Sequence, residues 1–419
     1  MAVDAAVIGL GYVGLPLASV ATHAGLSVIG FDINSGIVDS LNAGKSHIDD
    51  LSDADVSAMV EAGFTSTTDE SLLAQARVIV ICVPTPLAED GGPDLRAVIG
   101  AVEAVARNLR PEMVVILEST TYPGTTDEVV RPKLEEGGLL AGQDFCLAYS
   151  PERIDPGNAT YGAQNTPKVV GGHTPACADA AAAFYGGFVE TVVRTKGTRE
   201  AEMAKLLENT YRHINIALVN EMTRFCHELG IDLWDVIEAA ASKPFGFQAF
   251  YPGPGVGGHC IPIDPNYLSH QVRARLGYPF RFVELAQEIN SGMPAYVLHR
   301  AQDILNDLGK PLRGSTILLL GVTYKANIAD QRESPAVPLA RQLIAKGAKV
   351  RYHDPHVPYW GPLGDGAIRV ESAMEGVAVA DLTILVQNHR EYAVDEIADA
   401  AEAFFDTRGV SEGPKAIRL

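Results

Sequence analysis

The sequence lacks several features that would place a protein in a special class. Its five cysteines are odd in number and widely spaced, and none forms a CxxC pair. This pattern argues against a disulfide framework and a zinc site, and it is typical of the reducing cytoplasm. Basic residues are scarce, since 33 lysines and arginines face 52 aspartates and glutamates and leave a net charge of −19. We therefore predict a cytoplasmic protein with no metal, no nucleic-acid partner and no membrane partner, although a pocket can still be locally positive.

Unbroken hydrophobic runs are also missing. The most apolar stretch, from Ala5 to Phe31, contains glycines and a proline and follows Asp4 rather than a basic region. It is therefore expected to be neither a signal peptide nor a membrane span. No segment is of low complexity, and a content of 47% hydrophobic and 20% charged residues is typical of a globular protein. The length predicts about two or three domains.

The first residues read as strand, glycine turn, helix and strand. The segment "AAVIGLGYVG" predicts a buried strand that runs into three glycines spaced GxGxxG, and the next strand ends at Asp32. In this context the glycines let a pyrophosphate lie against a helix N-terminus, while Asp32 can accept hydrogen bonds from a ribose and repel a 2′-phosphate. We predict an NAD site, with a tight turn that binds no ligand as the alternative. The predicted cofactor contacts are Gly9, Gly11, Tyr12, Val13, Gly14 and Asp32.

Three further strands are predicted at residues 77–86, 113–120 and 146–153. Each is apolar and ends in polar or proline-rich residues, as buried parallel strands do. Ligands of such sheets lie beyond the carboxyl ends of the strands. The residues expected near the cofactor or the reacting carbon are therefore Pro84, Thr85, Ser119, Thr120 and Glu152.

The rest of the chain predicts long helices and then a second copy of the beginning. Residues 197–241 read as a long helical region interrupted at Gly230, and residues 280–308 as another helix. Residues 315–355 repeat the strand, turn, helix and strand, ending at Asp354 but without the three-glycine spacing, and residues 381–389 supply another strand. We predict an α/β fold with two Rossmann-like doubly wound domains joined by a long central helix. The expected domains are 1–196, 197–310 and 311–419, and Asp354 is expected to be a structural strand end.

One stretch, "GPGVGGHCIPIDP", combines glycines with Cys260 and with Asp264 four residues later. Glycines let a backbone come close to a bulky group, and the cysteine can be a nucleophile, a metal ligand or an apolar filler. Lys205 and Asn209 are four residues apart on the predicted helix and so share one face. His259 is a less favoured base, because adjacent residues of an extended loop point apart.

Several segments together resemble the UDP-glucose/GDP-mannose dehydrogenase family over essentially the whole chain. They are "GLGYVGLP", "STTYPGTT", "SPERIDPGNA", "EMAKLLENTYRHINIALVNE", "FYPGPGVGGHCIPIDP" and "GVTYKANIADQRESPA". The resemblance implies oxidation of the C6 alcohol of a nucleotide sugar to a carboxylate, with two NAD reduced. It also implies that 1–196 is the NAD domain, 197–310 carries the cysteine loop and dimer core, and 311–419 binds the nucleotide sugar.

The resemblance also implies roles for individual residues. Cys260 would add to the aldehyde and give a thiohemiacetal, which a second hydride loss converts to a thioester that water hydrolyses. Lys205 would stabilise oxyanions. Acid and base roles stay divided among several groups, of which Asp264 is a candidate base and Glu152 can assist hydrolysis. The implied catalytic residues are Cys260, Lys205, Asn209, Asp264, Thr120 and Glu152.

The substrate side of the resemblance points to the UDP-N-acetylglucosamine branch and to a homodimer built on the central helix. UDP-glucose and UDP-N-acetylmannosamine are the alternative substrates. Two other functions are weighed: a two-electron 6-phosphogluconate- or hydroxyacyl-type dehydrogenase, which needs no thiol, and a non-enzymatic sensor, which has little reason to keep these residues together. Arg332 is implied to meet the cofactor. The implied substrate contacts are Glu152, Arg153, Lys205, Asn209, Arg212, His213, Tyr251, Gly253, Gly255, Gly257 and Lys325.

Overall fold

The structure is a computed structural model that describes residues 3–48, 50–88, 92–154, 160–258 and 261–419. The chain divides into two compact units. The first comprises residues 1–208 and 266–277, and the second comprises residues 209–265 and 278–419. Each unit contains one sheet, as predicted, whereas the three-part division of the chain stays a prediction.

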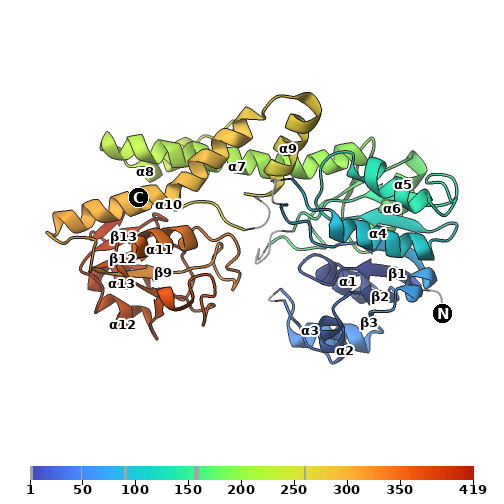
Figure 1. Ribbon diagram of the computed structural model, residues 1–419, viewed down its shortest axis with the longest axis horizontal. Coiled ribbons are helices and arrows are strands. Elements are labelled where there is room, and N and C mark those ends of the chain that lie inside the picture. The colour runs from blue at the N-terminus through green and yellow to red at the C-terminus, as the bar shows by residue number, and fades with distance from the viewer. Residues whose placement is uncertain (1–2, 49, 89–91, 155–159, 259–260) are drawn as a thin grey trace. The chain divides into compact units, whose positions relative to one another are not determined.

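The first unit is built on an eight-stranded sheet in the order β3-β2-β1-β4-β5-β6-β7-β8 (Figure 1). All of its strand pairs are parallel except β6 with β7. The six strands from β3 to β6 follow the order of a dinucleotide-binding sheet. The strands are β1 Val3–Ile8, β2 Val28–Phe31, β3 Thr65–Thr67, β4 Ala76–Ile81, β5 Val114–Leu117, β6 Cys146–Tyr149, β7 Lys168–Gly172 and β8 Val192–Arg194.

Helices cover both faces of this sheet, which is why its strands read as continuous apolar runs. Along β1, Ala6 and Ile8 pack into one hydrophobic cluster together with residues of α4, while Ala5 and Val7 pack into another together with residues of α1. This alternation is the two-residue period of a strand. The helices are α1 Gly14–His23, α2 Ser35–Asn42, α3 Asp53–Glu61, α4 Arg96–Asn108, α5 Arg131–Glu135 and α6 Pro175–Tyr185.

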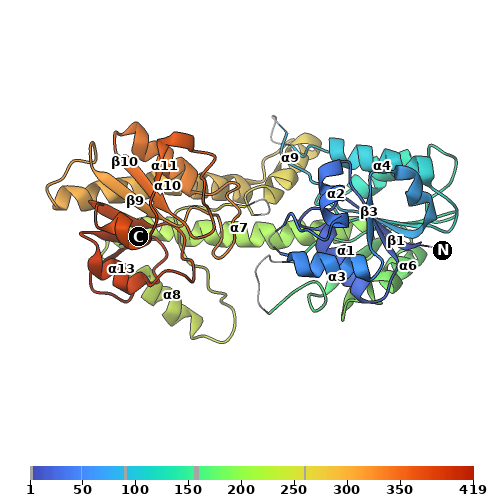
Figure 2. The ribbon, with the colours of Figure 1, turned by 90° about the horizontal axis from the view of Figure 1, so that it is seen from below.

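The second unit is built on a six-stranded, wholly parallel sheet in the order β11-β10-β9-β12-β13-β14 (Figure 2). This order repeats that of the six strands from β3 to β6, so the predicted second α/β copy is present. Its strands are β9 Thr316–Leu320, β10 Lys349–His353, β11 Ile368–Arg369, β12 Leu382–Leu385, β13 Phe404–Asp406 and β14 Ala416–Arg418. Its flanking helices include α11 Ala336–Ala345, α12 Ala373–Val377 and α13 Val394–Ala400.

Each of the two copies has an equivalent hydrogen bond at the carboxyl end of its first strand. In the first unit, the Leu10 N–H donates to Oδ2 of Asp32 at 2.9 Å. In the second unit, the Val322 N–H donates to Oδ2 of Asp354 at 2.7 Å. Each aspartate therefore ties the end of the second strand to the turn after the first strand. Asp354 is fully buried, whereas Asp32 is only partly buried.

The long helices match their predicted positions. The 31-residue helix α7 spans Thr198–Glu228, begins in the first unit and ends in the second. Gly230 follows it with φ +70°, in the left-handed region that suits a glycine after a helix. The remaining helices are α8 Leu233–Ala241, α9 Asp264–Leu276 and α10 Arg281–Asp307, of which α9 was not predicted.

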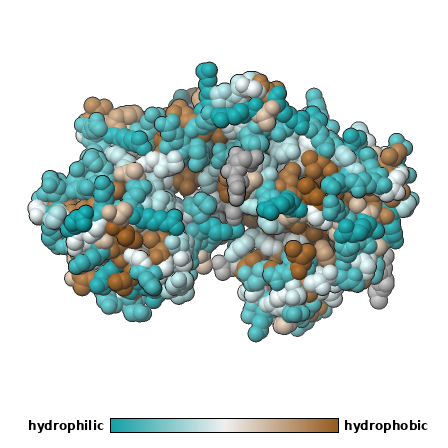
Figure 3. All heavy atoms as spheres, viewed as in Figure 1, coloured by the Kyte–Doolittle hydropathy of each residue, from teal (hydrophilic) through white to brown (hydrophobic). Residues whose placement is uncertain are grey.

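The described part of the chain shows a mixed surface and cysteines that are not disulfide-bonded. Among the described residues, no helix has the length and apolar content needed to cross a bilayer. The face drawn in Figure 3 shows hydrophilic residues interspersed with separate hydrophobic patches. Cys82, Cys177 and Cys226 are buried and Cys146 is partly buried, and all four are free thiols. The cytoplasmic location stays a prediction.

Candidate active site

The sequence-predicted residues of the first unit follow four neighbouring strands. They are the glycine turn after β1, Pro84 and Thr85 after β4, Ser119 and Thr120 after β5, and Glu152 after β6. Because these strands are parallel neighbours, their carboxyl ends share one edge of the sheet. The Ser119 hydroxyl donates to the carbonyl oxygen of Val83 at 2.7 Å and so links two of the loops.

The glycine turn after β1 is shaped by close contacts. A Cβ at Gly14 would lie 1.9 Å from the carbonyl oxygen of Gly9, so the first turn of α1 can approach β1 only through a glycine. Around Gly11, by contrast, no heavy atom lies within 4 Å of such a Cβ. The turn therefore has open space where a pyrophosphate would approach the start of α1. Tyr12 is exposed and Val13 is partly buried beside it.

Asp32 keeps its capacity to bind a ribose. Its Oδ2 accepts the Leu10 N–H and its Oδ1 accepts the Asn34 N–H, both at 2.9 Å. A carboxylate has about four lone-pair positions, so hydrogen bonds from ribose hydroxyls remain available. Its negative charge disfavours the phosphate of NADP. These residues fit NAD.

Lys205 and Glu152 form the charged centre of the first unit. The buried Lys205 Nζ donates to the main-chain carbonyl of Glu152 at 2.7 Å. One oxygen of the Glu152 carboxylate accepts the Ile154 N–H at 2.5 Å, and Lys168 Nζ lies 3.5 Å from the other. Burial alone would raise the pKa of Glu152, but the charges of Lys168 and Lys205 and this N–H bring it below its ordinary value. Glu152 is therefore an ionised carboxylate that can accept a proton.

In the second unit, Asn209 and Asp264 are in direct contact. The Asn209 amide donates to Oδ2 of Asp264 at 2.7 Å, and both side chains are buried. Asp264 begins α9, and Asn209 lies one helical turn after Lys205 on α7. The predicted pairing of an amide with a carboxylate is thus present. Cys260 and His259 lie outside the described residues, so the role of Cys260 stays a prediction.

The glycine loop before Cys260 packs against a segment of its own unit. A Cβ at Gly257 would lie 2.5 Å from the carbonyl oxygen of Glu333 and 2.7 Å from the side chain of Tyr324. The bulky group that this glycine accommodates is therefore in part the chain itself. Tyr251 is exposed and Gly255 is partly buried. Their contacts with a sugar stay predictions.

A chain of buried amides fixes the start of this loop. The Gly253 N–H donates to Oδ1 of Asn220 at 3.0 Å, and the Asn220 amide donates to Asn290 at 2.9 Å. Asn290 in turn donates to the carbonyl of His213 at 3.2 Å. Burial lowers the pKa of His213 to about 4, so its ring is uncharged at neutral pH, while the adjacent Arg212 is exposed. Although predicted together, these two side chains lie in different environments.

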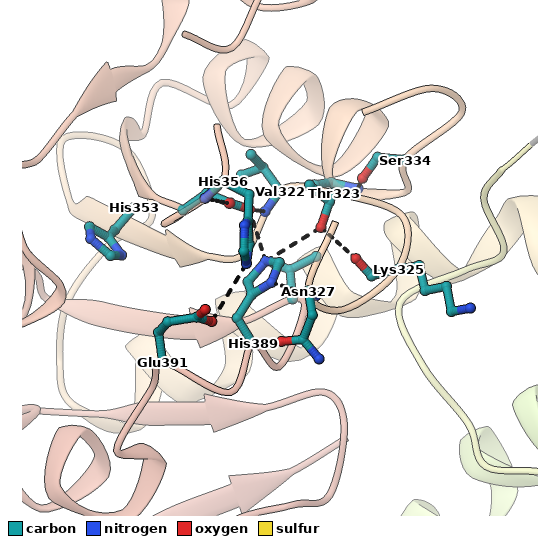
Figure 4. A network of polar contacts seen from close by, with 12 residues as sticks. Val322, Thr323, Lys325, Asn327, Ser334, His353, His356, His389 and Glu391 are labelled. Atoms are coloured by element: carbon teal, nitrogen blue, oxygen red, sulfur yellow. Dashed lines mark hydrogen bonds and ion pairs between the residues drawn. The ribbon is translucent and has the colours of Figure 1, made fainter. Parts of the chain in front are cut away.

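Lys325 lies in the loop after β9, which is held by the buried His389 (Figure 4). The Asn327 N–H donates to Nδ1 of His389 at 2.9 Å, and Nε2 lies 3.0 Å from Asp354. Because Nδ1 accepts, the proton of the neutral ring is on Nε2, which donates to Asp354. The Thr323 hydroxyl bonds the Lys325 carbonyl at 2.8 Å, and the Lys325 ammonium group points away from this network (Figure 4).

The same network contains a group that could be read as a metal site. Ligand atoms of His356, His389 and Glu391 lie within 4.8 Å of one another. Figure 4 shows the contact of His356 with Glu391, whose Nε2 and Oε2 atoms are 3.5 Å apart. Both nitrogens of His389 are already engaged in hydrogen bonds, so neither is available to a metal. We interpret the group as His389 held by its own hydrogen bonds, with His356 and Glu391 in contact beside it.

Two arginines predicted to contact ligands pair with acids. Arg153 binds Glu208 through two nitrogens, at 2.6 Å and 3.1 Å. Arg332 binds Asp330, with Nη2 2.5 Å from Oδ2. A diphosphate would therefore share each guanidinium group with a carboxylate. The ligand contacts of both arginines stay predictions.

Sequence reasoning missed Arg408, which follows β13. Its Nε donates to the carbonyl of Val386 at 2.7 Å, and a Cβ at Gly253 would lie 3.0 Å from its Nη1. Burial lowers the pKa of Arg408 to about 10, so it is still charged at neutral pH. Arg408 is partly exposed, and a partly buried cation at the carboxyl edge of a parallel sheet is suited to an anionic ligand. The signal was the polar "DTR" after the apolar pair Phe404 and Phe405, which is too short to be recognised as a strand.

The chain matches known proteins along its whole length. Three domain profiles of the UDP-glucose/GDP-mannose dehydrogenase family match in order: the NAD binding domain over residues 3–189, the central domain over 199–292 and the UDP binding domain over 318–413. The chain is 37% identical over 354 residues to the UDP-N-acetyl-D-glucosamine 6-dehydrogenase of Pseudomonas aeruginosa, covering 84% of this chain and 82% of that protein.

Other relatives carry a different sugar in their names. The chain is 33% identical over 420 residues to the UDP-N-acetyl-D-mannosamine dehydrogenase of Methanococcus maripaludis, covering 97% of this chain and 92% of that protein. It is also similar to the solved structure of the UDP-D-ManNAc dehydrogenase of Pyrococcus horikoshii, with a TM-score of 0.88 and 31% identity over 99% of this chain and 98% of that one. These matches confirm the predicted fold and the NAD-binding domain.

Proposed function

The chain belongs to the UDP-glucose/GDP-mannose dehydrogenase family and is an NAD-dependent nucleotide-sugar dehydrogenase, and we propose that it oxidises the C6 alcohol of UDP-N-acetylglucosamine to a carboxylate. The observation that carries this proposal is the presence, in order, of an NAD binding domain and a UDP binding domain. The choice of sugar is supported by the 37% identity to the Pseudomonas aeruginosa enzyme named for that sugar.

UDP-N-acetylmannosamine is the second candidate substrate. Relatives named for it align over more of the chain, 97% against 84%. Both sugars carry a 2-acetamido group and differ in its orientation on the ring, so one set of reacting groups would serve either. The enzyme would therefore distinguish the two substrates by how it binds the sugar and not by the chemistry at C6.

In the proposed first oxidation, Asp264 takes the proton of the C6 hydroxyl, directly or through a water, as the hydride leaves the carbon. Asn209 holds the carboxylate by its hydrogen bond of 2.7 Å. The Lys205 ammonium group stabilises the charge that develops on the sugar oxygen. When bound, NAD supplies the acceptor for one hydride in each of the two oxidations.

In the proposed second oxidation, the Cys260 thiolate adds to the aldehyde carbon, because an aldehyde has no carbinol hydrogen to give up until a nucleophile has added. Loss of the second hydride from the thiohemiacetal leaves a thioester. Water then attacks the thioester carbon, the C–S bond breaks, and the thiolate is regenerated. Glu152, which is ionised, accepts a proton from that water.

The substrate proposal is tested by comparing kcat/KM for UDP-N-acetylglucosamine, UDP-N-acetylmannosamine, UDP-glucose and GDP-mannose under one set of conditions. The proposal expects UDP-N-acetylglucosamine to exceed each of the others by about tenfold or more, a difference of about 1.4 kcal/mol in transition-state binding. A preference for UDP-N-acetylmannosamine or UDP-glucose would agree with the proposed reaction but contradict the proposed substrate. Activity on a non-nucleotide hydroxy acid alone would contradict the proposed reaction.

We further propose that the chain forms a homodimer through α7. Tyr211, Leu218 and Phe225 recur every seven residues on this helix and are 45%, 53% and 45% exposed. Seven residues are about two helical turns, so the three side chains form one apolar stripe. A stripe of large apolar side chains is typical of a surface that a second copy covers.

Sedimentation velocity tests the dimer. The variant Leu218→Glu places a charge in the stripe and should shift the protein toward monomer. Ile368→Glu, at another exposed apolar side chain of the second unit, is the matched control and should not change the oligomeric state. A wild-type monomer, or a Leu218→Glu variant that sediments as wild type does, would contradict this proposal.

A further inference from the structure

A buried cluster beside Glu152 contains two charged residues that the proposed mechanism does not use, Glu118 and Lys168. The Lys168 ammonium group bonds one oxygen of Glu118 and lies 3.5 Å from the Glu152 carboxylate. The Tyr185 hydroxyl donates to the other oxygen of Glu118 at 2.8 Å. The side chains of Glu118 and Lys168 are 0% and 9% exposed, so the ion pair is removed from water.

The direction of β7 brings Lys168 to the edge of the sheet where ligands bind. Strand β7 runs antiparallel to β6, with Ala148 opposite Gly172 and Tyr149 opposite Gly171. The numbers in each pair sum to 320, so an extension of this register places Glu152 opposite Lys168. Opposite charges at facing positions attract. Glu118 follows the neighbouring strand β5 and completes the cluster.

Stability alone does not explain such a cluster. A buried ion pair costs desolvation energy and is often no more stabilising than apolar side chains of similar size. This cluster has two carboxyl groups on the Lys168 ammonium group, and Lys205 is a second cation beside Glu152, so four ionisable groups are largely removed from water. Buried charges with strongly shifted pKa values are typical of functional sites.

The two carboxylates that share Lys168 differ in their protonation. Burial raises the pKa of Glu118 to about 7, against the attraction of Lys168. The pKa of Glu152 lies below its ordinary value, because the charges of Lys168 and Lys205 outweigh its burial. Near neutral pH, Glu118 therefore exchanges its proton while Glu152 stays charged.

We propose that Lys168 is a positioning residue for Glu152, which fixes one oxygen of that carboxylate and keeps it in the charged form, and that Glu118 in turn holds Lys168 in place. This inference rests on the proposed function, in which Glu152 accepts a proton from the water that hydrolyses the thioester. The Ile154 N–H fixes the other carboxylate oxygen at 2.5 Å. Other titratable groups around the cluster are Lys205 on α7, Tyr185 on α6 and Cys82 after β4.

The test follows hydrolysis of the protein-bound sugar in a single turnover, by rapid quench and intact-protein mass, as a function of pH. The double variant Lys168→Met with Glu118→Gln removes the ion pair without leaving an uncompensated carboxylate. Its half-maximal hydrolysis should move to higher pH by about one unit or more, because Glu152 loses a cation at close range. At pH values below both half-maximal points, the hydrolysis rate relative to that at about pH 8 should then be about tenfold lower than in the wild type, because one unit of pKa changes the ionised fraction of the carboxylate about tenfold there.

Conservative variants separate positioning from mere folding. Lys168→Arg keeps the charge and should retain most of the wild-type dependence of hydrolysis on pH. Glu118→Gln alone keeps Lys168, so the pH of half-maximal hydrolysis should stay at or below its wild-type value. Lys133→Met removes a lysine that pairs with Glu103 at 3.0 Å elsewhere in the unit, and it should leave the profile unchanged. If the double variant does not fold, Lys168→Gln supplies the same comparison without the charge.

The possible results distinguish this inference from the proposed function. The absence of any protein-bound sugar in the wild type would contradict the thioester route itself. A Glu152→Gln variant that hydrolyses the protein-bound sugar at the wild-type rate would contradict the proposed role of Glu152 as proton acceptor. A slow Glu152→Gln variant combined with a wild-type pH profile in the double variant, at unchanged NAD affinity, would overturn the inference about Lys168 alone.

Discussion

Replacing Asn209 by leucine tests the pair that the proposed mechanism places next to the C6 hydroxyl. The Asn209 amide donates to Asp264 at 2.7 Å, and both side chains are buried. Leucine keeps the volume but removes the donor, so Asp264 loses a hydrogen bond to a charged group worth about 1.5–3 kcal/mol. If this bond holds Asp264 in the orientation that accepts the C6 proton, and so stabilises the transition state more than the ground state, kcat should fall by about tenfold to a hundredfold, since each 1.36 kcal/mol is about a factor of ten in rate.

The assay is steady-state formation of NADH with UDP-N-acetylglucosamine. Asn215→Leu is the matched control, because Asn215 lies on the same helix and, within the described part of the chain, its amide donates to the Tyr211 carbonyl of its own helix, at 2.7 Å. It should change kcat by less than about twofold. A kcat for Asn209→Leu within about twofold of wild type, or an equal loss in the control, would refute the reasoning.

Three further predictions concern the loop after β9, a buried acid and the cofactor. His389→Ala leaves the Asn327 N–H without its acceptor and removes one of the hydrogen bonds of the buried Asp354, so the free energy of unfolding in urea should fall by about 2–5 kcal/mol. The KM for the UDP-sugar should rise by a larger factor than the KM for NAD. Burial raises the pKa of Glu202 to about 7, above its usual 4.5, so the contribution of Glu202 to stability is fully present below about pH 4.5 and is lost as the pH rises to about 7. Glu202→Gln should reduce that fall by up to about 3 kcal/mol in urea unfolding at about pH 5 and about pH 8. Asp32→Asn keeps a hydrogen-bond acceptor but removes the charge, and the ratio of kcat/KM for NAD over NADP should fall by about tenfold or more; an unchanged ratio would count against a ribose contact.

The fold could be predicted because its signals are local. The strand, glycine turn and helix around Gly9 and Gly14 occupy consecutive residues, and Asp32 and Asp354 mark the same position in two copies of one pattern. The long helix could also be predicted from its local sequence, since no proline interrupts it and Gly230 follows its end. The short strand β7 was not predicted, because its place in the sheet depends on antiparallel pairing with β6.

The charged groups around the candidate site were only partly predictable. Lys205, Asn209 and Asp264 were named from their spacing and from a family resemblance. Lys168 and Glu118 are 50 residues apart, and their contact depends on how three strands align. The approach of Arg408 to the glycine loop likewise joins segments that are distant in the sequence. Such contacts arise from the tertiary fold, and no periodicity or short motif encodes them.

The count of NADH formed per sugar consumed tests the central claim most directly. Purified protein is given a limiting amount of UDP-N-acetylglucosamine with excess NAD, and the sugar product is identified by its mass. The proposed four-electron route through Cys260 predicts about two NADH for each sugar and a carboxylate product. One NADH per sugar with release of an aldehyde would contradict the covalent route.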